Sequence, residues 1–262
     1  MSLQFIMGNS GSGKSYCLYD TVVREAIENP DKNYLVIVPE QFTMQTQKDL
    51  CLAHPKGGIM NIDVLSFGRL AYRVFEEVGQ DARVVLDDEG KNLVLRKIAG
   101  ECEKDLKVFK GNLKKQGYIS EVKSVLSEFA QYGVDFERLD DFMKEVPPES
   151  YLHYKLDDIR TIYEKFEEYL SEKYITKEEM LDVLSDAVPY SDILKGSVVA
   201  MDGFTGFTPV QNRLIGELFS VCEKVMITVT MDGRENPYVY EHPYQIFALG
   251  KQMVTSLMKI AG

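Results

Sequence analysis

The most constraining feature of the sequence is a glycine-rich octapeptide near its N-terminus, GNSGSGKS at residues 8–15. It matches the pattern GxxxxGK[ST] at every required position. An apolar run typical of a buried strand precedes it at residues 3–7, and a helical pattern follows it at residues 14–27. Glycines let such a loop wrap closely enough for backbone N–H groups to point at an anion, and the following helix adds the positive end of its dipole. The sequence therefore predicts a P-loop that binds a nucleoside triphosphate.

The residue types of this loop assign a role to each position. We expect Lys14 to reach the β and γ phosphates as a point charge and Ser15 to offer its hydroxyl to magnesium. The expected cofactors are therefore ATP and Mg²⁺. A glycine-rich turn that only resembles a P-loop is the alternative, but here strand, loop and helix occur in the required order. The predicted phosphate-binding residues are Gly8, Asn9, Ser10, Gly11, Ser12, Gly13, Lys14 and Ser15.

Besides the loop itself, a P-loop site needs an acidic residue from another strand to hold the magnesium. Asp202 directly follows the apolar run at residues 197–201, which is where Walker B aspartates lie, so Ser15 and Asp202 are the predicted magnesium ligands. The alternative is a strand-ending Asp202–Gly203 turn. An ATPase often places a glutamate after the aspartate to activate the attacking water, and here Gly203 takes that place. We therefore expect nucleotide binding with weak or no hydrolysis.

Apolar runs at both ends of the chain predict an α/β fold with a parallel sheet. Helical patterns separate several of these runs, from about residue 67 to 78 and from about 209 to 219. From about residue 86 to 188 the sequence shows helical periodicity with almost no strand signal. We therefore predict an α/β P-loop domain from residues 1–84 and 190–262, interrupted by an all-helical subdomain at 85–189. The predicted strands are residues 3–7, 34–38, 62–65, 197–201 and 225–230.

Composition limits the partners that the chain can have. Its formal net charge is −11, so any contact with nucleic acid needs a local basic stripe or a partner protein. Neither a basic signal-peptide start nor an apolar run of the ~20 residues that a membrane span requires is present, so we expect a cytoplasmic protein without a membrane partner. The four cysteines and three histidines are scattered and predict no zinc site.

Four sequence blocks carry a resemblance to a known family. They are GNSGSGKS at residues 8–15, VPEQFTMQTQ at 38–47, VLSFGRLAYRVFEEVG at 64–79 and MDGFTGFTPVQ at 201–211. In this order they resemble the N-terminal part of the AddB/RexB family, the B subunits of the ATP-dependent helicase/deoxyribonuclease that processes double-strand DNA ends. Many families share the P-loop, and the other three blocks are far more specific.

The resemblance implies a P-loop NTPase fold of the superfamily 1 helicase-like type, that is, a first motor domain with a helical insertion. It also implies pairing in a heterodimer with an AddA-type helicase/nuclease subunit. Single-stranded and duplex DNA ends are the implied substrates. In this family the region is considered a degenerate motor that serves in recombination-hotspot recognition. The family's nuclease motif and iron–sulfur cysteines belong to a C-terminal region, so a chain like this is expected to be an N-terminal fragment without nuclease activity.

By the same analogy, the blocks at residues 38–47 and 64–79 occupy positions where related helicases contact single-stranded DNA. Arg69 and Arg73 lie four apart on one helix face and suit phosphate contact, and Phe67 suits base stacking. The alternative is that the phenylalanine packs in the core and the arginines pair with acids such as Glu76 or Glu77. The candidate DNA contacts are Gln41, Ser66, Phe67, Arg69 and Arg73.

Two weaker clusters favour ordinary explanations. The basic stretch Lys104, Lys107, Lys110, Lys114 and Lys115 suits a DNA backbone, but nearby acids reduce its charge and a solvated face explains it as well. The acids of residues 87–89 are expected at the start of a helix, because they complement its dipole.

Two other classes of function stay open. One is a stand-alone P-loop kinase or phosphotransferase that acts on a small molecule, although no substrate-binding acid or arginine lid can be identified. The other is a scaffold domain with a vestigial P-loop. Dependence on DNA distinguishes the helicase-like function from the kinase, and affinity for nucleotide distinguishes both from the scaffold.

Overall fold

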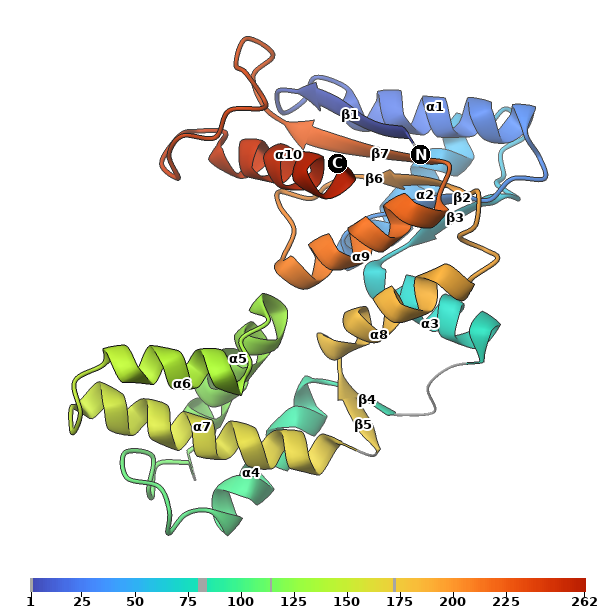
Figure 1. Ribbon diagram of the computed structural model, residues 1–262. Coiled ribbons are helices and arrows are strands. Elements are labelled where there is room, and N and C mark those ends of the chain that lie inside the picture. The colour runs from blue at the N-terminus through green and yellow to red at the C-terminus, as the bar shows by residue number, and fades with distance from the viewer. Residues whose placement is uncertain (1, 80–83, 114, 172) are drawn as a thin grey trace. The chain divides into compact units, whose positions relative to one another are not determined.

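The computed structural model describes residues 2–79, 84–113, 115–171 and 173–262, which form two compact units (Figure 1). The first unit combines both ends of the chain, Met1–Gln80 and Leu181–Gly262, and the second is Asp81–Met180. The units meet between residues 80 and 81 and between residues 180 and 181, whereas the sequence predicted boundaries at 84/85 and 189/190. The second of these structural boundaries falls inside the helix Glu179–Ala187 (α8).

A five-stranded parallel sheet forms the centre of the first unit, with strand order β1-β7-β6-β2-β3. Each strand lies at a predicted apolar run, so the mixed α/β fold with a parallel sheet is confirmed. The strands are Ser2–Gly8 (β1), Tyr34–Ile37 (β2), Ile62–Leu65 (β3), Val198–Met201 (β6) and Lys224–Thr230 (β7).

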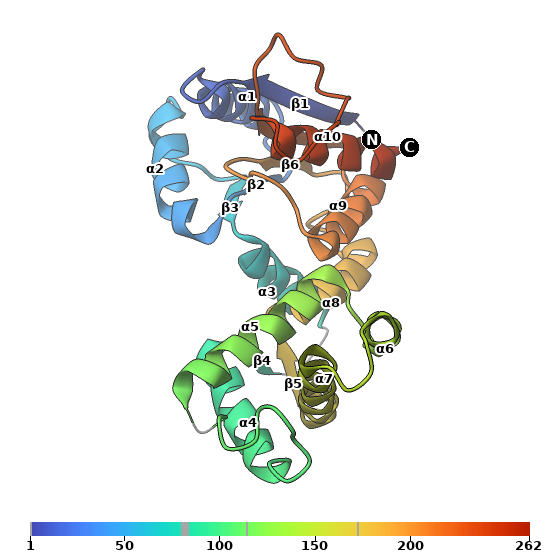
Figure 2. The same cartoon turned by 90° about the vertical axis from the view of Figure 1, so that its left-hand side faces the viewer.

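Helices cover both faces of this sheet (Figure 2). On one face Val36, Val198 and Ala200 pack against Leu18 of α1 and Leu50 of α2. The opposite face is covered by α9 and α10. Burial of both faces explains why these strands are continuously apolar rather than alternating. The helices of the first unit are Lys14–Glu28 (α1), Thr43–Ala53 (α2), Phe67–Val78 (α3), Pro209–Val221 (α9) and Ala248–Ala261 (α10), with 3-10 turns at Glu40–Phe42 (η1) and Val188–Tyr190 (η2).

The second unit is mainly helical but also contains a short parallel pair of strands, β4 (Val84–Leu86) and β5 (Tyr174–Thr176). The prediction of an all-helical subdomain was therefore wrong on this point. Each strand has only three residues, which is too short for an alternating or continuous apolar pattern to be recognised. The helices are Asp88–Glu101 (α4), Gln116–Tyr132 (α5), Phe136–Glu145 (α6) and Tyr151–Leu170 (α7).

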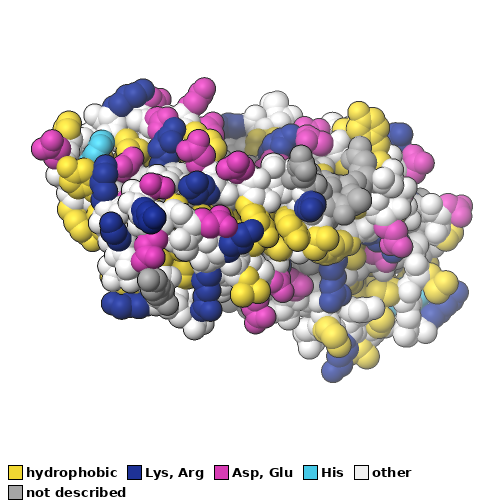
Figure 3. Space-filling view, turned by 90° about the horizontal axis from the view of Figure 1, so that it is seen from below, with side chains coloured by type: hydrophobic (Ala, Val, Ile, Leu, Met, Phe, Trp, Pro, Cys, Tyr) yellow, Lys and Arg dark blue, Asp and Glu magenta, His cyan; other side chains and the backbone are white. Residues whose placement is uncertain are grey.

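Two sequence interpretations for this unit can be compared with the structure. The Asp87 carboxylate caps α4 by accepting from the Gly90 amide at 2.7 Å, which confirms the acids there as a helix start. The basic stretch is held by the buried Asp158, which accepts the amides of residues 107, 108 and 109 at 2.7–2.8 Å. Lys107 pairs with Asp157, and Lys114 lies outside the described residues. On the face shown in Figure 3, basic and acidic side chains are likewise interspersed.

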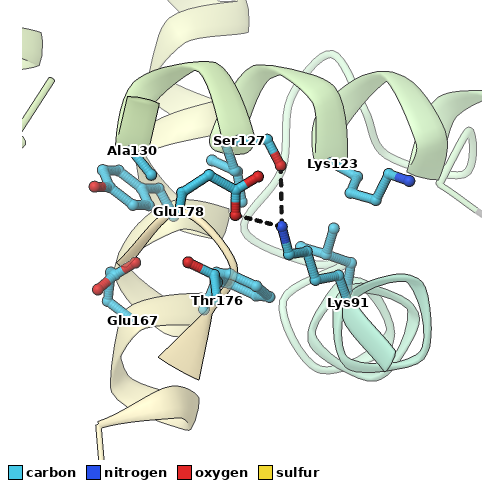
Figure 4. A pocket seen from close by; sticks show the side chains of 11 residues that line it. Lys91, Lys123, Ser127, Ala130, Glu167, Thr176 and Glu178 are labelled. Carbon is cyan, nitrogen blue, oxygen red and sulfur yellow. Dashed lines mark hydrogen bonds and ion pairs between the residues drawn. The ribbon is translucent and has the colours of Figure 1, made fainter. Parts of the chain in front are cut away.

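A buried ion pair lies between the helices of the second unit (Figure 4). The Lys91 ammonium contacts Glu178 at 2.6 Å and Ser127 at 3.3 Å, and the Lys91 side chain is 3% exposed. Glu167 lines the same small cavity. Burial, with a smaller contribution from the Glu179 carboxylate, raises the pKa of Glu167 to about 7.

No helix in the described part of the chain has the length and apolar character needed to cross a bilayer.

The raised pKa of Glu167 predicts how stability depends on pH. Between about 4.5 and about 7 the folded chain binds a proton that the unfolded chain has released, so stability falls as pH rises through this range. Glu167→Gln should therefore raise the unfolding temperature at pH 8 and leave it nearly unchanged at pH 5, measured by circular dichroism. The exposed neighbour Glu168 offers the control Glu168→Gln, and equal effects of Glu167→Gln at both pH values would contradict the assignment.

Candidate nucleotide site

The glycine-rich loop leaves the sheet at the carboxyl end of β1 and closes tightly on itself. The Ser12 amide donates to the Asn9 carbonyl at 3.1 Å. Gly11 and Gly13 have φ values of 75° and 86°, a left-handed conformation that other residues adopt only at a cost. A Cβ on Gly8 would collide with the Ser12 hydroxyl, so any side chain at this position would force Ser12 to shift.

Positive charge gathers where this loop meets α1. Lys14 is the first residue of the helix, and its ammonium donates to the Asn9 carbonyl at 2.8 Å, across the loop. Gly13 caps the helix without a side-chain hydrogen bond, and the first turn carries no acid. By contrast, Ser66 and Thr208 cap α3 and α9 with their hydroxyls. The N-terminal amides of α1 and the Lys14 ammonium are thus arranged to receive an anion.

Asp202 lies at the same edge of the sheet, directly after β6. Its side chain continues the row of Val198 and Ala200, which faces α1 and α2. In the pairing of β6 with β7, Met201 is opposite Ile227, so Asp202 comes level with Thr228. β7 itself pairs with β1. One strand therefore separates the glycine-rich loop from Asp202, and the Asp202 carboxylate faces the helix that begins at this loop.

Two hydroxyl groups hold this carboxylate, which is 7% exposed. Thr228 donates to Oδ1 of Asp202 at 2.6 Å, and Tyr19 of α1 donates to Oδ2 at 2.8 Å. The Tyr19 oxygen also lies 3.2 Å from the hydroxyl of Thr46 in α2. Burial above all, together with the nearby carboxylate, raises the pKa of Tyr19 well above its usual range. Tyr19 therefore keeps its proton and remains a donor.

The donor set fits a magnesium–nucleotide complex. The residues that the structure describes include no group of three or more His, Cys, Asp or Glu side chains that could hold a metal ion. Magnesium at a nucleotide site needs fewer protein ligands, because phosphate oxygens and water complete its octahedron. A hydroxyl on Ser15 and a carboxylate on Asp202 are the ligand types that this requires.

A surface hollow of 450 Å³ begins beside Ser15 and extends between α1 and α2. Two carboxylates, Asp20 and Asp49, line it together with Tyr16 and Leu52. Negative charge disfavours phosphate in this hollow, so the loop is the better phosphate site.

Two of the candidate DNA contacts, Ser66 and Phe67, lie at the carboxyl end of β3. Ser66 caps α3 by accepting from the Arg69 amide at 3.3 Å, and Phe67 is 6% exposed. The Phe67 ring packs against Phe204 and Phe207, with centroids 5.4 and 6.4 Å away. Phe67 therefore serves as a packing residue in this structure, and stacking on a base remains a prediction.

The other candidates differ in their surroundings. Arg73 pairs with Asp63 at 3.0 Å, whereas the sequence suggested Glu76 or Glu77 as partners. Arg69 is exposed, and no ion pair involving it occurs among the described residues. Gln41 is exposed in η1, at the carboxyl end of β2. The sheet thus places Gln41, Ser66 and Phe67 along the same edge as the glycine-rich loop, and their contact with DNA stays a prediction.

Comparison with known proteins identifies the family. Residues 5–262 match the family model described as "ADDB, N-terminal". The chain belongs to the AddB N-terminal family. It is 46% identical over 262 residues to the B subunit of the ATP-dependent helicase/deoxyribonuclease of Lachnoclostridium phytofermentans, covering 100% of this chain and 23% of that protein. The protein of the same name from Clostridium tetani is 37% identical over 235 residues, or 89% of this chain and 20% of that protein. This AddB-family chain therefore spans less than a quarter of the length of these relatives.

Sequence reasoning missed the residues that surround Asp202 in this AddB-family chain. Thr228 lies inside an apolar strand, and only the pairing of β6 with β7 brings it to Asp202. Tyr19 did carry a signal, because it follows Ser15 by four positions and so lies on the same face of α1. Thr46 could not be found, since α2 was not predicted as a helix.

Proposed function

We propose that this chain is an ATP–magnesium-binding, helicase-like domain of a B-type subunit of a helicase/nuclease that processes DNA breaks. The observation that carries the proposal is that one edge of a parallel sheet presents both the glycine-rich loop with Lys14 and the buried Asp202. In open α/β sheets, ligands bind at the carboxyl ends of the strands. Membership of the AddB N-terminal family supports the biological setting.

Each part of the site then has a physical task. The loop amides and the N-terminus of α1 bind the phosphate oxygens, and Lys14 exchanges its bond to the Asn9 carbonyl for the phosphates. Ser15 and Asp202 would hold magnesium, which supplies charge neutralisation to the phosphates when it is bound. The buried cluster of Thr228 and Tyr19 keeps the Asp202 side chain oriented.

Weak or absent hydrolysis follows from the residue after Asp202. Gly203 has a φ of 79°, and a glutamate in this left-handed conformation would be strained. The backbone itself therefore disfavours the carboxylate that would activate water. This supports a motor that binds nucleotide without rapid turnover, as expected of a degenerate helicase domain.

The proposed macromolecular partners follow from the relatives, which are named as B subunits of a helicase/deoxyribonuclease. We propose an AddA-type partner subunit, single-stranded and duplex DNA ends as substrates, and a contribution to recombination-hotspot recognition. Gln41, Ser66, Arg69 and the aromatic cluster of Phe67 lie at the carboxyl edge of the sheet, which suits a DNA path past the nucleotide.

Lys14→Ala is the direct test of the nucleotide site. Removing the ammonium should abolish ATP–magnesium binding measured by calorimetry, because the loop sequence GNSGSGKS contains no second lysine or arginine to replace it. The exposed Lys48 of α2 offers the control Lys48→Ala, which should bind as the wild type does.

The same experiment distinguishes the other functions. A wild-type chain that does not bind ATP would leave a scaffold with a vestigial loop. Steady-state hydrolysis that proceeds without DNA would favour a phosphotransferase. Binding with negligible turnover is the result that the helicase-like function predicts.

Arg69→Ala tests the DNA edge. If the Arg69 guanidinium contacts a phosphate, its removal should weaken single-stranded DNA binding roughly tenfold and lower the salt slope by about one. Fluorescence anisotropy over a salt series, with the AddA-type partner present, measures both. The exposed Arg24 of α1 provides the control Arg24→Ala, and equal losses for the two variants would indicate only non-specific charge.

A further inference from the structure

The hydrogen bonds around Asp202 have a direction. A tyrosine hydroxyl has one proton, and Tyr19 donates it to Oδ2 of Asp202 at 2.8 Å. The contact of 3.2 Å between Tyr19 and Thr46 must then have Thr46 as its donor. The protons thus point from Thr46 to Tyr19 to Asp202. In such a chain each bond polarises the next, so the Tyr19 hydroxyl is a stronger donor than it would be alone.

Tyr19 reaches Asp202 from α1, the helix that begins at the glycine-rich loop. It lies four positions after Ser15 on the same face of α1, and Ser15 is the expected magnesium ligand of the loop. Thr228 occupies Oδ1 of Asp202 from within the sheet and is itself buried. Oδ2 is therefore the oxygen on the side of α1, and the Tyr19 hydroxyl covers it.

From this geometry we infer that Tyr19 sets how strongly nucleotide binding depends on magnesium. The inference rests on the proposed nucleotide site and deepens it. The hydroxyl hydrogen of Tyr19 and the metal, or a water bound to it, seek the same lone pairs of Asp202. A neutral donor on Oδ2 stabilises the carboxylate without the metal and so reduces what the metal adds. Tyr19 thus tunes the metal half of the site, which is formed by the expected magnesium ligands Ser15 and Asp202, and it takes no part in a chemical step.

The same hydroxyl links this metal half to α2. Thr46 is buried and is the fourth residue of α2, which directly follows the 3-10 turn η1 that contains the exposed Gln41. A change in the bond between Tyr19 and Asp202 therefore reaches α2 through one further hydrogen bond.

Tyr19→Phe tests the inference because it removes the hydroxyl and keeps the ring. The quantity measured is the ratio of the ATP dissociation constant in EDTA to that in excess magnesium, by calorimetry on the 262-residue chain. Loss of a hydrogen bond to a charged group should raise this ratio roughly tenfold. Thr46→Val should raise it less, since the bond from Tyr19 to Asp202 remains. The exposed Tyr16 gives the control Tyr16→Phe, which should leave the ratio unchanged.

A merely structural role for Tyr19 gives a different result. It would lower both affinities together and the unfolding temperature of the free chain, with the ratio unchanged, and this outcome overturns the inference. A ratio that falls in Tyr19→Phe overturns it as well. If the wild-type chain binds ATP in neither condition, the proposed nucleotide site fails and this inference fails with it. Wild-type binding that Lys14→Ala abolishes, together with an unmoved ratio in Tyr19→Phe, rejects only the role of Tyr19.

Discussion

Parallel pairing of β1 with β7 and of β7 with β6 is the constraint on which the candidate site depends. It aligns strands from opposite ends of the chain, so that the loop after β1 and Asp202 after β6 meet at one edge with a single strand between them. The alternation of side chains then decides which face each residue serves. Asp202 and Thr228 continue rows whose earlier members, Ala200 and Met226, are buried against α1 and α2. The polar cluster is therefore an extension of the hydrophobic core.

This location has an energetic consequence for Asp202. A carboxylate with so little exposure must be compensated by donors, and Thr228 and Tyr19 provide them from two different elements. The aspartate is thus oriented by the fold before any ligand binds. The loop is organised in the same way, because the Asn9 carbonyl accepts both the Lys14 ammonium and the Ser12 amide. Hydrogen bonds within the chain thus order both parts of the candidate site, the loop and Asp202.

Much of the sheet unit could be predicted because local signals were strong. The helix at residues 67–78 is confirmed at both ends, since Ser66 caps its start and Gly79, with a φ of 69°, ends it. The strand at residues 62–65 is confirmed as well. By contrast, α2 has only three buried residues, and β4 and β5 have three residues each, so none of them shows a clear period. The neighbours of Asp202 and the packing of Phe67 on Phe204 depend on tertiary pairing, which periodicity does not encode. The choice of Asp63 as the partner of Arg73 has the same origin.

We propose that the carboxyl edge of the sheet, at the glycine-rich loop, receives a nucleoside triphosphate. The decisive experiment is hydrogen–deuterium exchange of the free chain, compared with the chain in saturating ATP and magnesium. Slower exchange in peptides that cover residues 8–17 and the segment after β6, with the second unit unaffected, is the predicted result. Unchanged exchange at the loop, or protection confined to the second unit, would contradict the assignment of the site.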